Sequence, residues 1–204
     1  MSISIKTARE IEKMRRAGEL LEKVHDELGR AIHPGMSTWE INKLGEEMIR
    51  SFGCTPNFLN YNGYPASICV SVNEEVVHGI PSKKRILKEG DIVSLDAGLI
   101  YKGYHSDAAR THAVGKVSTE AQKLMDVTKQ SFFEGIKMAK EGQHLHDISR
   151  AIEEYVTPYG YGIVRDLVGH GIGTALHEDP QIPNYAQKRR GVRLPVSYTH
   201  LTLP

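Results

Sequence analysis

The stretch GDIVSLDAGLIYKGYHSDAART, residues 90–111, constrains the fold more than any other part of the sequence. Two sets of side chains alternate along its first half, one of them entirely apolar, which is the period-two pattern of a β-strand. Lys102-Gly103 forms a plausible tight turn, because glycine adopts positive φ at no steric cost. With that turn, Asp96 faces Ala109. The stretch therefore predicts an antiparallel hairpin.

Asp96 and Asp107 share one face of this predicted hairpin, diagonal to each other and roughly 7–8 Å apart. Two carboxylates on one strand face repel each other, and such a violation is expected at functional sites, where another interaction offsets the cost. A divalent cation would do so, because buried charges are usually paired or coordinate metals. The alternative is that both aspartates lie at a solvated sheet edge or in turns. The hairpin alone leaves both interpretations open.

The charge balance gives no reason to expect a nucleic acid or a membrane as partner. Lys and Arg total 26 and Asp and Glu total 25 in 204 residues, a net charge of +1. No stretch approaches the length of a transmembrane helix, and the N-terminus MSISIKTARE lacks the apolar core of a signal peptide. Cys54 and Cys69 make no disulfide framework in a chain this long. We therefore expect a soluble, cytoplasmic protein.

Four helices are predicted by apolar residues at helical spacing and by signals at the helix ends. They cover about residues 7–29, 37–52, 118–140 and 146–157. The first two begin with capping boxes, Thr7-Ala8-Arg9-Glu10 and Ser37-Thr38-Trp39-Glu40. Between the second and third helices the chain changes to short strands and turns, with a strand expected at Ser67–Val72 before the hairpin.

An internal repeat relates the two halves of the chain. Each of four residues recurs 107 positions later: Gly35, Glu40, Ile41 and Gly53 are matched by Gly142, Asp147, Ile148 and Gly160. Both sets mark the same place, where a long helix and a Gly break precede a shorter helix closed by Gly. The repeat predicts an α/β (α+β) fold of two similar halves, about 7–113 and 114–194, each with helices packed on an antiparallel sheet.

Three histidines stand out among the ten. His170 lies between two glycines in LVGHGIG, His177 follows seven residues later, and His78 precedes a Gly-Ile-Pro turn, where small residues let other groups approach. Two Asp and a His form an oxygen and imidazole ligand set suited to Mn, Fe, Co or Zn. Two such ions activate a water and polarise a carbonyl, and further histidines could hold a substrate. His105 shares the carboxylate face, and His112 lies on the opposite face.

Three segments, SLDAGLIYKGYHSDAART, VVHGIP and GHGIGTALHEDPQIPNY, together resemble the type I methionine aminopeptidases. The likeness runs from about Thr7 to Leu194. It implies the duplicated pita-bread (creatinase/aminopeptidase) fold, with residues 1–194 as one catalytic domain. The implied activity is the removal of the initiator methionine from nascent proteins, by attack of a dimetal-activated water on the first peptide bond.

The resemblance also implies a role for individual residues. Asp96 and Asp107 would be metal ligands, with Asp107 bridging two divalent ions (Co, Mn, Fe or Zn), and His170 would be the imidazole ligand of one of them. His78 would contact the scissile peptide, and His177 would help to polarise its carbonyl. Three residues fall where the family lines its methionine pocket: Tyr61, Tyr64 and Cys69. An apolar pocket with a polarisable thiol suits a thioether, and the alternative for the thiol is an ordinary core cysteine.

By the same resemblance, the partners are the N-termini of nascent polypeptides with a small second residue. We expect a monomer that binds neither DNA nor membranes, and association with the ribosome is left open. One alternative is another pita-bread metallopeptidase, such as a proline-specific aminopeptidase, although those usually carry an extra N-terminal domain. A second alternative is a non-catalytic pita-bread module that binds peptides, although such proteins usually lose ligands throughout.

Residues 195–204, PVSYTHLTLP, do not resemble the family. The family completes its metal site with two glutamates beyond the GHGIG segment, one of which also serves as general acid and base, and this tail contains no carboxylate. Shifting Asp96 by the repeat gives position 203, which is Leu. We therefore expect a C-terminally truncated chain whose second half is incomplete. As written, it should have little or no aminopeptidase activity.

Overall fold

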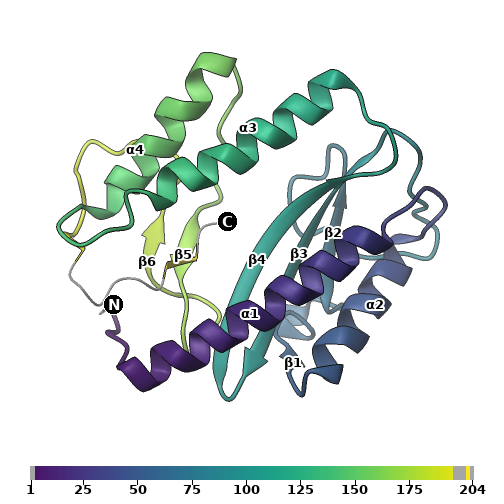
Figure 1. The fold of residues 1–204 in the computed structure, drawn as a ribbon, viewed down its shortest axis with the longest axis horizontal. Helices are drawn as coiled ribbons and strands as arrows, with labels where there is room; N and C mark the ends of the chain where they lie inside the picture. The colour runs from purple at the N-terminus through teal and green to yellow at the C-terminus, as the bar shows by residue number, and fades with distance from the viewer. Residues whose placement is uncertain (1–2, 195–200, 203–204) are drawn as a thin grey trace. The chain divides into compact units, whose positions relative to one another are not determined.

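The computed structural model describes residues 3–194 and 201–202 (Figure 1). The α-helices are α1 (Ala8–Ala31), α2 (Thr38–Ser51), α3 (Thr119–Ile136) and α4 (Leu145–Val156), and short 3-10 turns cover Tyr61–Gly63 and Thr157–Tyr159. The strands are β1 (Thr55–Pro56), β2 (Ile68–Val72), β3 (Ile92–Tyr101), β4 (Tyr104–Ala113), β5 (Gly169–Gly171), β6 (Glu178–Ile182) and β7 (Leu201–Thr202). None of the helices in these residues is both long enough and apolar enough to span a bilayer.

The chain divides into two compact units. The first unit holds Ala8–Gln122 and Gly173–Leu176, and the second holds Lys123–Ile172 with the segments before Ala8 and after Leu176. The division lies near the repeat boundary expected from the sequence. It places the hairpin with both aspartates in the first unit, and the GHGIG histidine in the second. That residues 1–194 form one catalytic domain stays a prediction.

The first unit is a four-stranded antiparallel sheet covered by two helices. Strand β4 pairs with β3 along its whole length, so β1 and β2 share the opposite edge of β3. Helix α1 packs on β3 and β4, and α2 packs on β1 and β2 (Figure 1). Alternate residues of β3 enter the core between these layers, together with one stripe of each helix. The largest side chains of this core are Leu21, Leu28, Ile41, Ile49, Ile68, Leu87, Leu95 and Leu99.

The hairpin has the register that the sequence predicts. Asp96 pairs with Ala109, and Asp107 pairs with Gly98. Lys102 and Gly103 both have positive φ, 48° and 82°, as a two-residue type I′ turn requires. Because the apolar set of β3 is buried under the helices, the other set, which contains Asp96, must lie on the opposite face of the sheet. Asp107 lies on that same face.

The second unit is built on a smaller sheet with strand order β6-β5-β7. Its core contains Val127 of α3, Ile148 and Ile152 of α4, and Ile182 of β6. Helix α3 ends at Ile136, earlier than expected, because the chain tightens there into a turn in which the Met138 N–H donates to the Gly135 carbonyl, at 2.9 Å.

The internal repeat is confirmed at the level of backbone conformation. Helices α2 and α4 begin at Thr38 and Leu145, which differ by the predicted offset of 107 residues. The glycines before these helices, Gly35 and Gly142, have φ of 91° and 85°, and the glycines after them, Gly53 and Gly160, have φ of 70° and 75°. All four need the left-handed region that glycine enters without a Cβ penalty.

Hydrogen bonds outside the helices repeat with the same offset. The Gly35 N–H donates to the Leu87 carbonyl at 2.8 Å, and the Gly142 N–H donates to the Leu194 carbonyl at 3.0 Å. The residues before the two helices form isolated β-bridges that match in the same way, Ser37 with Ile86 and His144 with Arg193. Each half therefore ties the start of its short helix to a later segment of the same half, as expected of duplicated units.

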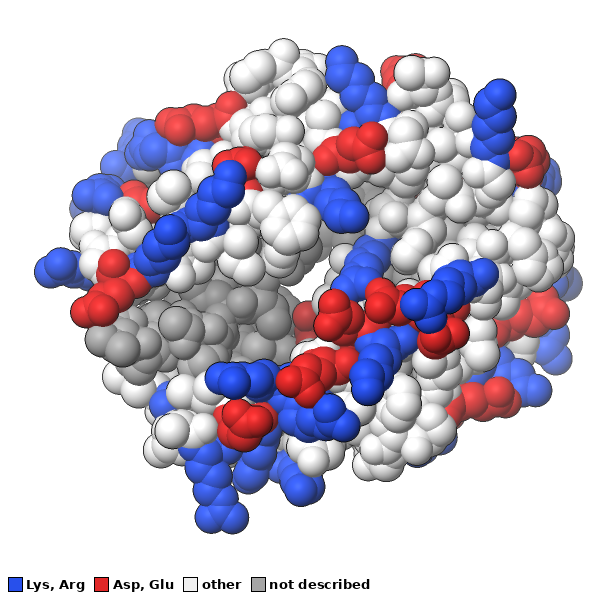
Figure 2. Space-filling model, viewed as in Figure 1, with Lys and Arg blue, Asp and Glu red and all other residues white. Residues whose placement is uncertain are grey.

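Charges of both signs are interspersed on the face drawn in Figure 2. On and beside α1 they form ion pairs, including Arg16 with Glu19 at 2.8 Å and Arg110 with Asp26 at 2.7 Å. Exposed pairs of this kind contribute about 0.2–1 kcal/mol each. They agree with the balanced numbers of acidic and basic residues in the sequence.

One buried titratable group lies between α1 and the hairpin. His25 is fully buried, and its Nε2 donates to the Ala108 carbonyl at 2.8 Å, whereas Nδ1 has no hydrogen-bond partner in the part of the chain that the structure describes. Burial, with a smaller contribution from the charge of the nearby Arg110, lowers the pKa of His25 from 6.5 to about 4. The folded protein therefore holds this imidazole neutral under conditions where the unfolded chain protonates it.

We expect the free energy of unfolding to fall as the pH drops from about 6.5 to 4, since a depressed folded-state pKa stabilises the fold only above the unfolded value. The contribution of His25 to this loss is at most about 3 kcal/mol. In His25→Gln, which can keep a donor toward Ala108, the pH dependence should flatten. Urea unfolding of both proteins at several pH values measures the difference. An unchanged slope in the variant would contradict the assignment.

Candidate active site

Asp96 and Asp107 are in direct contact on the face of the sheet opposite the helices. Their carboxyl groups are hydrogen-bonded to each other. Burial raises the pKa of Asp96 well above its usual range, and the charge of Asp107 raises it further. The prediction that the two aspartates share a face, diagonal to each other, is confirmed.

This carboxylate pair fits a divalent cation. Two acidic groups in contact are stable without a partner only if they share a proton, whereas a cation between them would remove the repulsion and satisfy both. Within either unit taken alone, no group of three or more His, Cys, Asp and Glu of the described residues could hold an ion. Asp96 and Asp107 would supply two ligands from the first unit, and their metal role stays a prediction.

Tyr64 and Cys69 form a second contact in the first unit. Cys69 pairs with Asp96 in the β2–β3 register, and its thiol lies near the Tyr64 hydroxyl. The same hydroxyl lies 2.8 Å from the Gly79 carbonyl, to which it can donate. Burial raises the pKa of Cys69 to about 12, with a contribution from the charge of Asp96. The thiol is therefore neutral at physiological pH, which suits a pocket wall rather than a nucleophile.

The other two predicted residues of this unit lie in loops. Tyr61 opens the 3-10 turn after β1 and is 38% exposed. His78 is exposed and has a positive φ of 59°, which is uncommon for a residue with a Cβ. The next residue, Gly79, lies against β2 so closely that a Cβ there would be 2.2 Å from the Val70 carbonyl oxygen. This close approach fixes the backbone that carries His78.

His170 and His177 lie together in the second unit, with ring centroids 4.3 Å apart. The Nδ1 of His170 lies 2.9 Å from the Gly171 carbonyl oxygen. Since a carbonyl only accepts, Nδ1 carries the proton, and the lone pair of the neutral ring is on Nε2, as in a metal ligand. A Cβ at Gly171 would lie 2.4 Å from the Asp179 carbonyl oxygen, so the glycine allows β5 and β6 to approach.

An ion pair beside His177 could not be predicted from the sequence pattern. Lys6, which is 8% exposed, donates to Glu178 at 2.5 Å and to the Ser4 hydroxyl at 2.9 Å. Glu178 begins β6 and pairs with Gly171 of β5. The pair therefore fastens the N-terminal segment to the strand that follows His177. In the sequence, the one sign that could have pointed to this ion pair is the charged Lys6 at the end of the alternating segment SISIK.

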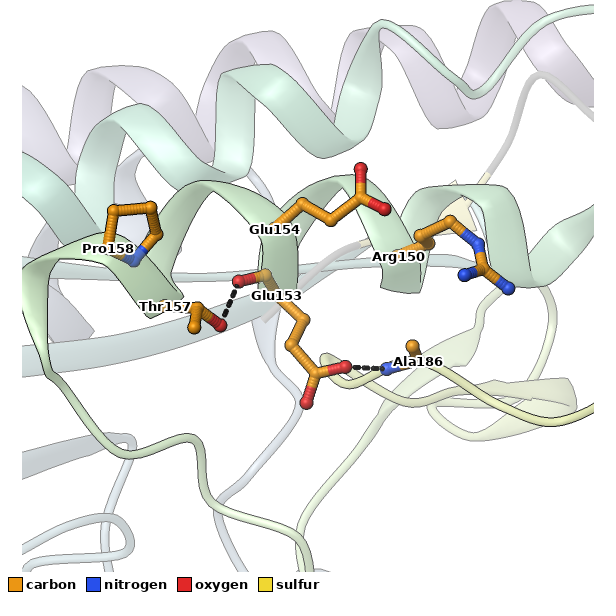
Figure 3. A pocket seen from close by; sticks show the side chains of 6 residues that line it. All are labelled: Arg150, Glu153, Glu154, Thr157, Pro158 and Ala186. Carbon is orange, nitrogen blue, oxygen red and sulfur yellow. Dashed lines mark hydrogen bonds between the residues drawn. The ribbon is translucent and has the colours of Figure 1, made fainter.

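A pocket of about 400 Å³ lies elsewhere in the second unit, beside the C-terminal half of α4 (Figure 3). It is lined by Arg150, Glu153, Glu154, Thr157, Pro158 and Ala186. The Glu153 carboxylate accepts a hydrogen bond from the Ala186 N–H at 2.8 Å, which fixes the loop across the pocket (Figure 3). None of the predicted site residues lines it, and we assign it no role.

Residues 12–197 match the model of metallopeptidase family M24. A methionine aminopeptidase of Clostridium acetobutylicum is 53% identical over 192 residues, which cover 94% of this chain and 77% of that protein.

Solved structures agree with the sequence comparison. A methionine aminopeptidase from Thermotoga maritima matches with a TM-score of 0.93 and 45% identity, covering 96% of this chain and 79% of that one. An X-Pro aminopeptidase from the same organism matches with a TM-score of 0.79 and 27% identity, covering 95% of this chain and 52% of that one. The predicted pita-bread fold is confirmed by these neighbours.

We expect Asp96→Asn to stabilise the metal-free chain by about 1 kcal/mol, because it removes one of two carboxyl groups in contact and leaves an amide that can donate to Asp107. The same change should remove the stabilisation that Mn²⁺ gives the parent through binding the folded state. Thermal unfolding with and without Mn²⁺ measures both effects. Asp26→Asn, which changes an exposed carboxylate, is the control and should keep the Mn²⁺ effect. A lower stability of metal-free Asp96→Asn would contradict the account.

Proposed function

The chain belongs to metallopeptidase family M24, and on that premise we propose that it removes the initiator methionine from nascent proteins. The observation that carries the proposal is its identity with methionine aminopeptidases over nearly the whole chain. The contact between Asp96 and Asp107 supports it independently, because this carboxylate pair fits the divalent metal that a metallopeptidase uses.

Three side chains would hold the metal: Asp96, Asp107 and His170, with the Nε2 lone pair of His170 as the nitrogen ligand. We propose two ions of Co, Mn, Fe or Zn. When bound, they would supply a water of lowered pKa and polarise the carbonyl of the first residue. Between the aspartates, they would replace the shared proton that the carboxyl pair otherwise needs.

The protein's own groups would then orient the substrate. His177 would donate to the carbonyl oxygen of the scissile bond and stabilise the negative charge that develops there. Its contact with the His170 ring supports a place beside the metal site. His78 would contact the scissile peptide from its exposed loop, with its backbone fixed by the close packing of Gly79 on β2.

The methionine side chain would enter a pocket lined by Tyr61, Tyr64 and Cys69. The neutral thiol near the Tyr64 hydroxyl supports this assignment, because it offers a polarisable surface that carries no charge. We further propose that the substrates are nascent chains with a small second residue, and that the protein acts as a cytoplasmic monomer. Association with the ribosome is an open part of the proposal.

Two other functions fit the observations less well. A proline-specific aminopeptidase of the same fold is disfavoured, because the X-Pro enzyme is less similar and only about half of it is covered. A non-catalytic module that binds peptides is disfavoured by the intact aspartates and GHGIG histidine. The first alternative predicts a preference for X-Pro peptides, and the second predicts that no peptide is hydrolysed.

The proposal is tested with a chimaera that joins residues 1–194 to the C-terminal segment of the C. acetobutylicum enzyme. With Mn²⁺ or Co²⁺ it should hydrolyse Met-Ala-Ser much faster than Leu-Ala-Ser, and Asp107→Asn should lower turnover roughly 100-fold. Preference for an X-Pro peptide, or metal binding without hydrolysis, would contradict the proposal. The 204-residue chain, assayed in parallel, tests only the expectation that its own tail does not support activity.

A further inference from the structure

Asn57 connects three strands of the first unit. It follows β1 and is 5% exposed. Its backbone N–H donates to the Gly98 carbonyl of β3 at 3.2 Å. Its side-chain Nδ2 donates to the Ser106 carbonyl of β4 at 3.2 Å, and it lies 3.4 Å from Nδ1 of His105. The side chain therefore passes across β3 to reach β4.

This path is open only because residue 98 is glycine. A Cβ at Gly98 would lie 2.2 Å from Oδ1 and 2.5 Å from Nδ2 of Asn57, closer than atoms approach in real structures. Gly98 has no positive φ that would demand glycine for conformational reasons. The glycine therefore serves to make room for the amide. In the hairpin register it is the partner of Asp107.

The path of the Asn57 side chain across β3 lowers the stability of the fold. Oδ1 of Asn57 is buried and has no hydrogen-bond partner among the described residues. A buried polar atom without a partner is destabilising, and native structures keep few of them. A glycine inside a strand weakens it as well. Two unfavourable features at one point, beside an aspartate of the carboxylate pair, are typical of a functional site.

We propose that Asn57 is a positioning residue for Asp107. The carbonyl that Asn57 Nδ2 holds belongs to Ser106, and the planar peptide unit contains this carbonyl together with the N and Cα atoms of Asp107. Fixing the Ser106 carbonyl therefore fixes the point from which the Asp107 side chain extends. The bond from the Asn57 N–H to Gly98 holds the opposing strand. The inference rests on the metal-ligand role proposed for Asp107.

The test compares Mn²⁺ affinity with thermal stability, because a role in packing alone would change only the second. The dissociation constant is measured from the electron paramagnetic resonance signal of free Mn²⁺, and the melting temperature is measured without metal. Asn57→Ala should weaken Mn²⁺ binding roughly tenfold, the lower end of the effect of residues that orient metal ligands. Asn57→Ala combined with Gly98→Ala refills the space without the amide, so it should recover stability but not affinity.

Asn42 provides a matched control in the same unit. It is 2% exposed, and its Oδ1 accepts hydrogen bonds from the Ser67 and Ile68 N–H groups at 2.9 and 3.0 Å. Asn42→Ala should lower the melting temperature and leave Mn²⁺ affinity within about twofold, because Asn42 holds backbone that contains no proposed ligand.

Each outcome decides between the two roles. If Asn57→Ala binds Mn²⁺ as tightly as the parent, or if the double variant recovers both affinity and stability, Asn57 acts through packing and the inference is wrong. If the parent itself does not bind Mn²⁺, the proposed metal site fails instead, so the two failures are distinguishable. Should Asn57→Ala not fold, Asn57→Ser, which keeps part of the side-chain volume, is judged by the same criteria.

Discussion

The contact between the carboxyl groups of Asp96 and Asp107 is the constraint on which the site depends. Two acidic groups repel when ionised, and burial strengthens that repulsion. The hairpin holds them together because its type I′ turn fixes the register, and because the other face of β3 is committed to the core under α1 and α2. A slip of one residue would turn the aspartates toward the apolar core under the helices and turn the apolar set away from it, so the core itself enforces the contact.

The duplication explains why the chain contains two such helix and sheet units. Matching glycines, helix starts and backbone hydrogen bonds repeat at one offset, although few residues are identical between the halves. What the repeat preserves is backbone geometry, namely left-handed glycines and the ties from each short helix to a later segment. The chemistry has diverged, since the first unit holds the carboxylates and the second holds the two histidines in contact.

The parts that could be predicted from sequence follow local rules. The register of the hairpin, the shared face of its aspartates and the position of α4 all come from periodicity, turn chemistry and the repeat. The parts that could not be predicted depend on contacts between segments far apart in sequence. Asn57 reaches across Gly98 to Ser106, and Lys6 pairs with Glu178, and neither contact leaves a periodic signal. Gly98, inside β3 and paired with Asp107, was the one local indication of the Asn57 contact.

The central claim is that a divalent cation replaces the proton shared by Asp96 and Asp107. The most direct measurement is anomalous diffraction from crystals of the protein grown with Mn²⁺. The account predicts a peak between the two carboxylates, which no longer hydrogen-bond to each other. A structure in which Mn²⁺ is bound elsewhere while the two carboxyl groups remain hydrogen-bonded would contradict it.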